Sequence, residues 1–385
     1  MNKSLYIVAF SLAFATTGIA QNNEGQDKVI DLGTQTTTEL RKTQAVSTIY
    51  SDELDKNATT SPYNAIYGLL PGLSVMQNTS WGTDKSRLNV RGRGSLNGDT
   101  PLFVVDGFAR PLEYINLSEI ESISVLKDGA ATALWGGRGA NGVVLITTKR
   151  GIYSQKDIKV DYKFGLGFPV NQPEFADAYT YAKARNEALR YDGLQPDMDE
   201  ASFLSGGNSD LYPNVDWQKE ALRNHTTSHQ LDITFRGGGK RLRYFSVLNY
   251  KNDMGLLNSK YTDYTDRYNS QMKKYFLNLR MNLDVDITDA TKLKLSMLGM
   301  LRETKRPTTS EATLFEQIFN TPSAAFPVQT LNGFWGSNNV LKTNPIANLA
   351  DVGYYKLNQR MLQADLRLVQ DLSLIHISEP TRHAQ

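Results

Sequence analysis

The 385-residue sequence contains no cysteine, and this absence excludes disulfide scaffolds, thiolate metal sites and cysteine nucleophiles. Neither charge sign dominates, because 42 lysine and arginine residues balance 40 aspartate and glutamate residues, so no general attraction for nucleic acid is expected. Histidine is scarce, which leaves little for a histidine-based metal site or triad; the four are His225, His229, His376 and His383. No apolar run reaches the about 20 residues of a transmembrane helix, so any membrane contact would be made by β-strands.

The motifs that suggest catalysis lack their required context. Residues 137–142 match G-x-G-x-x-G, but a strand-like run follows them, whereas a dinucleotide site needs a helix there. Residues 237–240 (GGGK) precede Arg241 instead of the Ser or Thr of a phosphate-binding loop. No G-x-S-x-G sequence occurs. We therefore predict a protein that is not an enzyme and that has no cofactor and no metal site.

Three carboxylates that could form a catalytic pair have simpler explanations. Asp106 belongs to the dipeptide Asp106-Gly107, which is a strong signal for a tight hairpin turn. Glu119 and Glu121 fit solvated or salt-bridged positions. Nothing in the sequence places these groups at the separation of about 5–10 Å that glycoside hydrolysis needs.

The first twenty residues have the composition of an export signal. Lys3 gives a positive start, an apolar run covers residues 5–15, and Gly18-Ile19-Ala20 fits a signal-peptidase site. The alternative is an N-terminal membrane anchor, for which the apolar run is short. We expect cleavage after Ala20 and a mature protein outside the cytoplasm.

Residues 21–44 are polar and poor in aromatic side chains, as in a flexible segment. The short apolar island Val29-Ile30-Asp31-Leu32 lies within it. This island is either a turn without a role or an extended peptide that adds to the sheet edge of a partner. Residues 45–151 then alternate short strand-like and helix-like runs, which predicts a compact mixed α/β domain.

Arg91 and Arg93 follow a short strand-like run in the sequence RGRG. At positions i and i+2 of a strand they would share one face. They are then either a solvated charge pair or a pair held by the carboxylates of an enclosing wall through bidentate contacts. Because a buried charge is costly unless it is matched, such contacts would suit a reversible lock between two domains.

From residue 152 onward the pattern changes to six long segments with a period of two, which is the signal of half-buried strands. Apolar residues occupy one face clearly in 158–168, 277–285 and 362–368, whereas 241–251 has mixed faces. Short connections near 237–240 and 288–290 alternate with long ones near 170–228, 252–273 and 302–355. This alternation is typical of an up-and-down outer-membrane barrel. A soluble β-sandwich with insertions is the alternative.

The sequence resembles a known family over most of its length. Residues 101–107 (PLFVVDG) and 120–151 (IESISVLKDGAATALWGGRGANGVVLITTKRG) look like the plug of SusC-like, RagA-type TonB-dependent outer-membrane transporters. Residues 69–75 and 90–96 are similar to two further plug motifs, and 158–372 resemble the opening strands of the barrel. The residues of this chain that match the plug motif are Asp106, Gly107, Lys127, Asp128, Gly136, Arg138, Asn141 and Gly142.

The resemblance implies an α+β plug domain followed by an incomplete antiparallel transmembrane β-barrel, with six of about 22 strands present. It implies energy-coupled import of oligosaccharides or peptides across the outer membrane of a Gram-negative bacterium. The implied partners are the TonB–ExbB–ExbD complex, a SusD-like surface lipoprotein and outer-membrane lipid. It makes Val29, Ile30, Asp31 and Leu32 the candidate TonB box and Arg91 with Arg93 the candidate plug–barrel lock. The alternatives are a siderophore or vitamin receptor and a secreted glycan-binding β-protein without transport.

These expectations divide the chain into a signal peptide (1–20), a flexible segment (21–44), a plug domain (45–151), the start of a barrel (152–372) and a tail (373–385). The tail resembles translated sequencing-adapter read-through more than a natural polar terminus, so it is expected to be non-native. Six strands cannot enclose a domain of about a hundred residues. We therefore expect an N-terminal fragment of a transporter.

Overall fold

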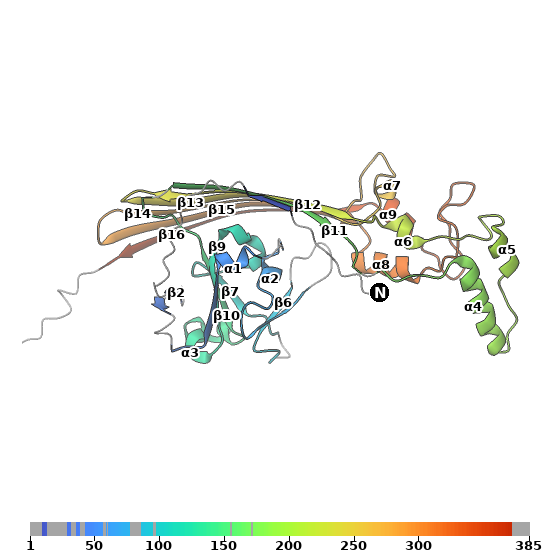
Figure 1. Ribbon diagram of the computed structural model, residues 1–385, viewed down its shortest axis with the longest axis horizontal. Helices are drawn as coiled ribbons and strands as arrows, with labels where there is room; N and C mark the ends of the chain where they lie inside the picture. Colours follow the sequence, from blue (N-terminus) through green and yellow to red (C-terminus); the bar gives the residue numbers. More distant parts are fainter. Residues whose placement is uncertain are drawn as a thin grey trace, which may run out of the picture.

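The computed structural model describes residues 43–56, 59, 61–77, 86–94, 98–154, 156–170 and 172–371, and the backbone of 10–13, 29–31 and 36–38. The predicted tail, Leu32 and most of the predicted signal peptide lie outside the described residues. Two parts are evident in Figure 1: a small α/β domain lies against one face of a broad curved sheet, and helices gather at one end of that sheet.

The α/β domain is built on a five-stranded sheet in the order β4-β9-β10-β7-β8. Its strands are β4 (Val46–Tyr50), β7 (Leu102–Val105), β8 (Phe108–Ala109), β9 (Ile120–Leu126) and β10 (Val143–Thr148). Strands β10 and β7 are parallel and the other neighbours are antiparallel. The sheet is therefore mixed in strand direction, and it forms part of the α/β domain that the sequence predicted for this region.

Short helical segments and a small hairpin cover this sheet. They are α1 (Ser51–Leu54), α2 (Pro62–Ala65), η1 (Leu112–Tyr114), η2 (Leu117–Glu119), α3 (Gly129–Thr132), η3 (Ala133–Gly139), β5 (Leu73–Met76) and β6 (Arg87–Val90). Their apolar side chains form two cores with the sheet: Ile66, Leu112 and Ile120 are fully buried in one, and Ala131 of α3 is buried in the other. Each buried isoleucine or leucine side chain contributes roughly 1.5–3 kcal/mol relative to its exposed state.

The turn between β7 and β8 shows how local sequence sets the backbone. Asp106 has φ 49° and Gly107 has φ 92°, and Val105 pairs with Phe108 across the two-residue turn. A two-residue hairpin turn of this kind needs positive φ at both central positions, which the Asp-Gly dipeptide tolerates. The predicted hairpin is confirmed.

The large sheet, here called the strand wall, consists of β11 (Lys156–Gly167), β12 (Thr226–Gly238), β13 (Leu242–Met254), β14 (Lys273–Asp286), β15 (Thr291–Pro307) and β16 (Tyr354–Gln370). All neighbours are antiparallel and follow chain order. The backbone of β1 (Phe10–Ala13) pairs with the free edge of β11. The predicted meander of long strands is confirmed.

The short and long connections lie at opposite ends of the strand wall (Figure 1). The long ones carry α4 (Ala178–Tyr191), α5 (Glu200–Ser205), α6 (Trp217–Ala221), α7 (Ser259–Thr262), α8 (Glu311–Asn320) and α9 (Pro345–Ala350). Buried side chains from three connections, including Trp217, Leu257 and Ile346, pack into a common core. We call this unit the loop cap. No helix within the described residues is long and apolar enough to cross a membrane.

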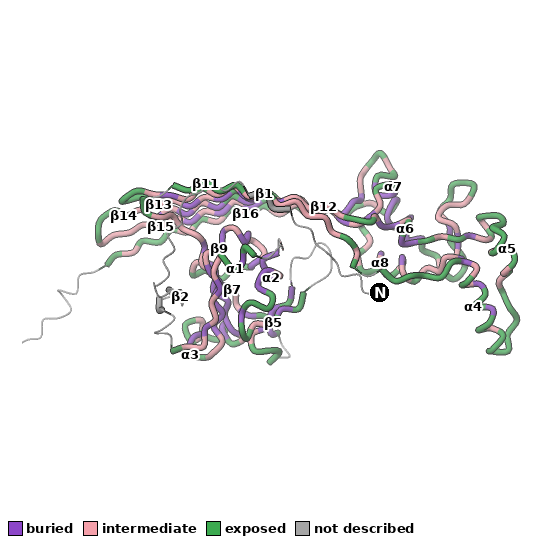
Figure 2. The backbone as a smooth tube through the Cα atoms, in the orientation of Figure 1, coloured by how far each residue is buried: buried purple, intermediate pink, exposed green. Residues whose placement is uncertain are grey.

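The two faces of the strand wall differ in chemistry. One face is outward and apolar; Ile158, Leu279 and Leu362 are exposed on it. The opposite, inner face carries mostly polar side chains and lies against the α/β domain, and Figure 2 shows buried positions along the strands above that domain. Strand β13 has mixed faces in the sequence because Phe245 and Val247 are inner-face residues that are completely buried.

Candidate functional site

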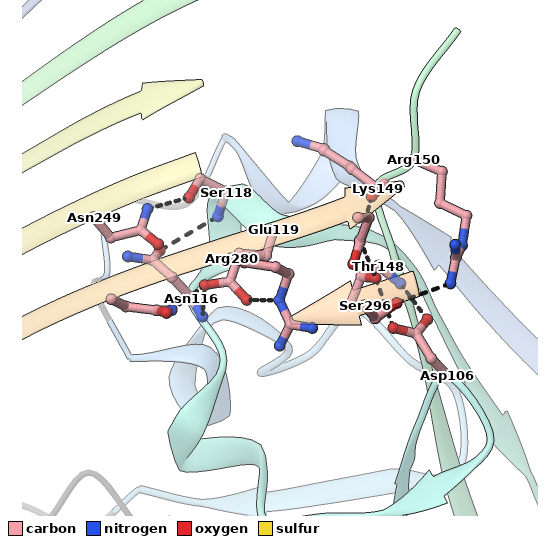
Figure 3. Close-up of polar contacts among 12 residues, drawn as sticks. Asp106, Asn116, Ser118, Glu119, Thr148, Lys149, Arg150, Asn249, Arg280 and Ser296 are labelled. Atoms are coloured by element: carbon pink, nitrogen blue, oxygen red, sulfur yellow. Dashed lines mark hydrogen bonds and ion pairs between the residues drawn. The ribbon is translucent and has the colours of Figure 1, made fainter. Parts of the chain in front are cut away.

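The α/β domain contacts the inner face of the strand wall through a row of polar side chains, which we call the polar seam (Figure 3). At its centre, Arg280 of β14 donates from Nε to Glu119 Oε2 at 2.5 Å, and the two side chains are 1% and 0% exposed. Asn278, two residues earlier on β14, donates a second hydrogen bond to Glu119. Removal of one partner from such a buried ion pair costs about 3–5 kcal/mol, because the other charge stays buried and unmatched.

Local sequence fixes the position of Glu119. Asn116 is the N-cap of η2 and accepts from the Ser118 backbone at 3.3 Å, while the Asn116 backbone donates to Glu119 Oε1 at 3.4 Å. This reciprocal capping box holds the carboxylate before it contacts the wall. Complete burial raises the pKa of Glu119, and the nearby Arg280 guanidinium opposes that rise.

The same turn contacts two more strands of the wall. Asn249 of β13 donates to Ser118 Oγ at 2.7 Å and to Asp232 of β12 at 2.8 Å. Asn116 also donates to Asp232, at 3.5 Å. The turn that begins β9 is therefore held by side chains of β12, β13 and β14.

A second group of contacts lies where β10 leaves the α/β domain. The Asp106 carboxylate accepts from the Thr148 backbone at 3.0 Å and from Thr148 Oγ1 at 2.7 Å, which joins the β7–β8 turn to β10. Asn282 of β14 donates to Thr148 Oγ1 at 2.9 Å. Arg150 pairs with Asp284 at 2.7 Å and donates to Ser296 at 3.2 Å.

Further ion pairs and hydrogen bonds extend the seam toward both of its edges. Arg110 pairs with Asp365 of β16 at 2.5 Å, and both side chains are largely buried. Arg236 of β12 pairs with Glu121 at 3.4 Å. Arg302 of β15 donates to the Glu113 carbonyl at 2.5 Å. The charges run in both directions across the seam, so neither surface is uniformly acidic or basic.

The sequence analysis considered three carboxylates of the seam, Asp106, Glu119 and Glu121, but did not predict that they lie at one interface. Glu119 and Glu121 were expected to be solvated or salt-bridged, and both are paired with wall arginines. Two signals could have identified Glu119: the N-x-x-E pattern of a capping box, and the polar residues Asn278 and Arg280 on the face of β14 opposite its apolar residues.

The premise for the candidate lock was wrong in one respect. Strand β6 ends at Val90, and Arg91 has φ 58°, so Arg91 and Arg93 do not share a strand face. Arg93 pairs with Asp99 of its own domain at 3.0 Å. A role for these two arginines in a plug–barrel lock stays a prediction.

Two charged residues of the predicted plug motif, Lys127 and Asp128, bind the segment of β4 to the rest of the α/β domain, and we call this pair the clasp. The Asp128 carboxylate accepts from the backbone N–H of Ala45 and of Ala131, each at 2.7 Å, and these bonds lower the pKa of Asp128. Lys127 donates to Ser47 Oγ at 2.5 Å and to the Pro71 carbonyl at 2.9 Å. The first strand is thus held by side chains as well as by its pairing with β9.

The glycine-rich part of the motif shapes the backbone and is not a nucleotide loop. Gly142 has φ 89°, and a Cβ added there would lie 2.7 Å from Val90 Cβ, so β6 packs directly against this glycine. Gly136 has φ 53°. Asn141 donates to the Gly98 carbonyl at 3.1 Å, and Arg138 is exposed within η3. Strand β10 follows at once, as the sequence predicted.

The candidate TonB box lies partly within the described residues. The backbone of β2 (Val29–Asp31) is extended and pairs with β3 (Thr36–Thr38). An extended backbone is what strand addition to a partner requires, and the assignment stays a prediction.

Comparisons with known proteins agree with this architecture. Residues 38–143 match the family model described as TonB-dependent Receptor Plug Domain. The chain is 30% identical over 283 residues to the TonB-dependent receptor SusC of Bacteroides thetaiotaomicron, and the match covers 69% of this chain and 26% of SusC. It is 28% identical over 281 residues to the TonB-dependent receptor P26 of Formosa agariphila, and that match covers 71% of this chain and 26% of P26.

Among solved structures, the RagAB peptide importer in its open-open state has a similar fold, with a TM-score of 0.64 and 22% identity over 83% of this chain and 38% of that chain. The chain spans about a quarter of the length of the curated relatives it matches. The strand wall is an unclosed part of such a barrel. The chain belongs to the SusC-like TonB-dependent receptors, and its α/β domain is their plug.

Proposed function

We propose that the full-length protein imports oligosaccharides or peptides across the outer membrane of a Gram-negative bacterium, with energy supplied through TonB. One observation carries this proposal. The plug rests on the polar inner face of a strand wall whose outer face is apolar, and polar contacts hold it there. Such an arrangement suits a wall that faces lipid on one side and a removable stopper on the other.

The dimensions of the apolar face fit a membrane. The outward residues of β14 are apolar from Tyr275 to Val285, a distance of ten residue steps. At about 3.4 Å per residue this is about 34 Å along the strand. A strand tilt of about 40° reduces it to about 26 Å along the membrane normal, close to the apolar band of about 25 Å in outer-membrane barrels.

Aromatic side chains lie in the part of that face nearer the loop cap. Tyr162 of β11 and Tyr250 of β13 are exposed on the outer face, in register with Leu277 of β14 and one step inside Tyr275. Tyr162 contacts His229 of β12, with 2.8 Å between its hydroxyl oxygen and Nδ1. Aromatic residues at the membrane interface are a feature of outer-membrane barrels, and these tyrosines fit that position.

The polar seam supports a gate that opens and closes. An apolar interface of the same size would bind the plug permanently, since exposure of its surface to water is unfavourable. Hydrogen-bonded and charged groups such as Glu119, Arg110 and Arg150 can exchange their partners for water when the plug moves. The pairs then select the closed arrangement without making it irreversible.

The N-terminal segment is the proposed point of traction. Residues Val29–Leu32 would bind TonB as an added strand, and the chain then leads to β4. Within the part of the chain that the structure describes, strand β4 is at the edge of the plug sheet and has β9 as its one neighbour. A pull on this strand would first load the clasp of Lys127 and Asp128 and then the rest of the plug.

The partners follow from the same assignment. TonB with ExbB and ExbD would transmit the inner-membrane proton gradient. A SusD-like lipoprotein would cover the loop cap on the cell surface, where the long connections converge.

The proposal is tested with the full-length gene in its own host. Cell fractionation should place the protein in the outer membrane. Deletion of the gene, or of tonB, should abolish growth on one class of oligosaccharide or peptide and leave growth on its monomers unchanged. Recovery of the protein in the soluble periplasm would contradict the proposal, and so would uptake that continues without TonB.

A further inference from the structure

The loop cap contains a cavity of about 660 Å³ that the preceding assignment does not use. It lies where the segments before α4 and α6 meet the end of α8, on the side of the strand wall that carries the long connections. Its volume is within the range of about 300–1,000 Å³ that is usual for small-ligand sites. The lining side chains used below are Glu174, Phe175, Asp177, Asn214, Asp216 and Gln218.

Hydrogen bonds between distant segments hold the cavity walls in place. Gln218 donates to the Pro173 carbonyl at 2.8 Å, and Asn214 accepts from the Ala178 backbone at 3.0 Å. Ser323, at the end of the α8 segment, donates to the Ala176 carbonyl at 2.8 Å. The three segments are therefore fixed to one another before a ligand arrives, which lowers the entropic cost of binding.

One wall of the cavity is an aromatic platform. Phe175 is 54% exposed although it lines the cavity, and it stacks on Phe319 of α8 with ring centroids 6.1 Å apart and an angle of 25°. Stacking restrains the ring without hiding it from solvent. The face of an aromatic ring carries partial negative charge and attracts the weakly positive C–H groups of a ligand.

The polar side chains of the lining are carboxylates, amides and hydroxyls. The lining includes three carboxylates, and none of its described residues is a lysine, arginine or histidine. Asp177 and Asp216 each accept a backbone N–H at a helix start, from Thr180 at 2.8 Å and from Lys219 at 3.1 Å. These bonds neutralise part of the negative charge and leave further acceptor capacity on each carboxylate.

We propose that this cavity binds a neutral sugar unit of an oligosaccharide, with Phe175 against the face of the ring and the Glu174, Asp177 and Asp216 carboxylates accepting from its hydroxyl groups. The inference rests on the proposed function and specifies its substrate class. An anionic sugar is disfavoured because the lining offers it three carboxylates and no cation. A cationic peptide side chain would compete for the same carboxylates, and the trilysine probe below separates it from a neutral sugar.

Binding is measured by calorimetry on the detergent-solubilised full-length protein. The neutral probes are the hexasaccharides of maltose, cellulose, xylan, mannan and laminarin type; trigalacturonate is the anionic probe and trilysine the cationic probe. At least one neutral probe should bind, and Phe175→Ala should weaken it about tenfold. Tyr191→Ala is the matched control, because Tyr191 is an exposed aromatic residue of α4 outside the cavity lining, and it should leave binding unchanged.

The inference is overturned if no neutral probe binds, if trilysine or trigalacturonate binds more tightly than every neutral probe, or if Phe175→Ala has no effect. Uptake separates this failure from failure of the proposed function. TonB-dependent uptake that persists with normal affinity in Phe175→Ala would refute the pocket alone. Absence of TonB-dependent uptake of any probe would refute the proposed function as well.

Discussion

The pair of Glu119 and Arg280 should dominate the free energy that keeps the plug on the strand wall. Glu119→Ala leaves the guanidinium of Arg280 buried at 1% exposure with no carboxylate, and it also removes the acceptor for Asn278. We expect plug docking to weaken by about 3–5 kcal/mol. The double change Glu119→Leu with Arg280→Met removes both charges and should recover most of this loss.

The assay uses a single thiol: the 385 residues contain no cysteine, and any cysteine elsewhere in the full-length protein is first replaced by serine. Leu134→Cys then places the thiol on an exposed position of the plug, and an attached spin label reports release of the plug from the full-length protein during urea titration. Asp197→Ala serves as the control, because it breaks an exposed ion pair: Asp197 is 47% and its partner Arg185 is 45% exposed. It should change the free energy of plug release by less than about 1 kcal/mol. A loss below 1 kcal/mol for Glu119→Ala, or a double variant as weak as the single one, would refute the reasoning.

Three further predictions follow from other parts of the structure. Asp128→Ala should destabilise the plug by about 1–2 kcal/mol in urea denaturation at pH 7. Because the pKa of Asp128 is lowered, wild-type stability should fall toward that of the variant as pH drops below 3.8. An equal stability difference at pH 7 and pH 2 would count against the clasp. Leu279→Arg, midway along the outer face of β14, should destabilise the membrane-inserted protein by about 2–4 kcal/mol and lower its yield in membrane fractions. Asn358→Arg, nearer the loop end of β16, should cost at most about 1 kcal/mol. Equal yields of the two variants in membrane fractions would exclude a lipid-facing surface. Gly142→Ala should lower the thermal midpoint of the plug through positive φ and the contact with Val90, while Gly129→Ala, which has open space around it, should not; equal midpoints would show that the backbone there tolerates a side chain.

The features that the sequence predicted are those set by local patterns. The apolar residues of 158–168 and 277–285 alternate with polar ones, and the structure places them on one face of long antiparallel strands. The Asp106-Gly107 dipeptide forms its turn because the required φ values are local. The fold class of an α+β plug with an incomplete barrel is confirmed on these grounds.

The features that escaped prediction depend on contacts between distant parts of the chain. Glu119 and Arg280 are 161 residues apart, so no local pattern indicates that they meet. Strand β13 has mixed faces because Phe245 is an apolar residue that is completely buried on the inner face of the strand wall, and its burial is not visible in the sequence. Arg91 fails as a strand residue because its positive φ ends β6 one residue earlier. The loop-cap cavity requires two long connections, β11–β12 and β15–β16, to pack together, which strand periodicity does not show.

The central claim is that the plug is a movable stopper seated on the polar seam. Ser118→Cys and Asn249→Cys introduce two thiols at side chains whose Oγ and Nδ2 atoms are 2.7 Å apart across the seam. The 385 residues contain no other cysteine, and any cysteine elsewhere in the full-length protein is first replaced by serine. A short thiol crosslinker that a reductant cleaves should abolish TonB-dependent uptake by the full-length protein, and reduction should restore it, while each single variant stays active. Full crosslinking with undiminished uptake would contradict the account.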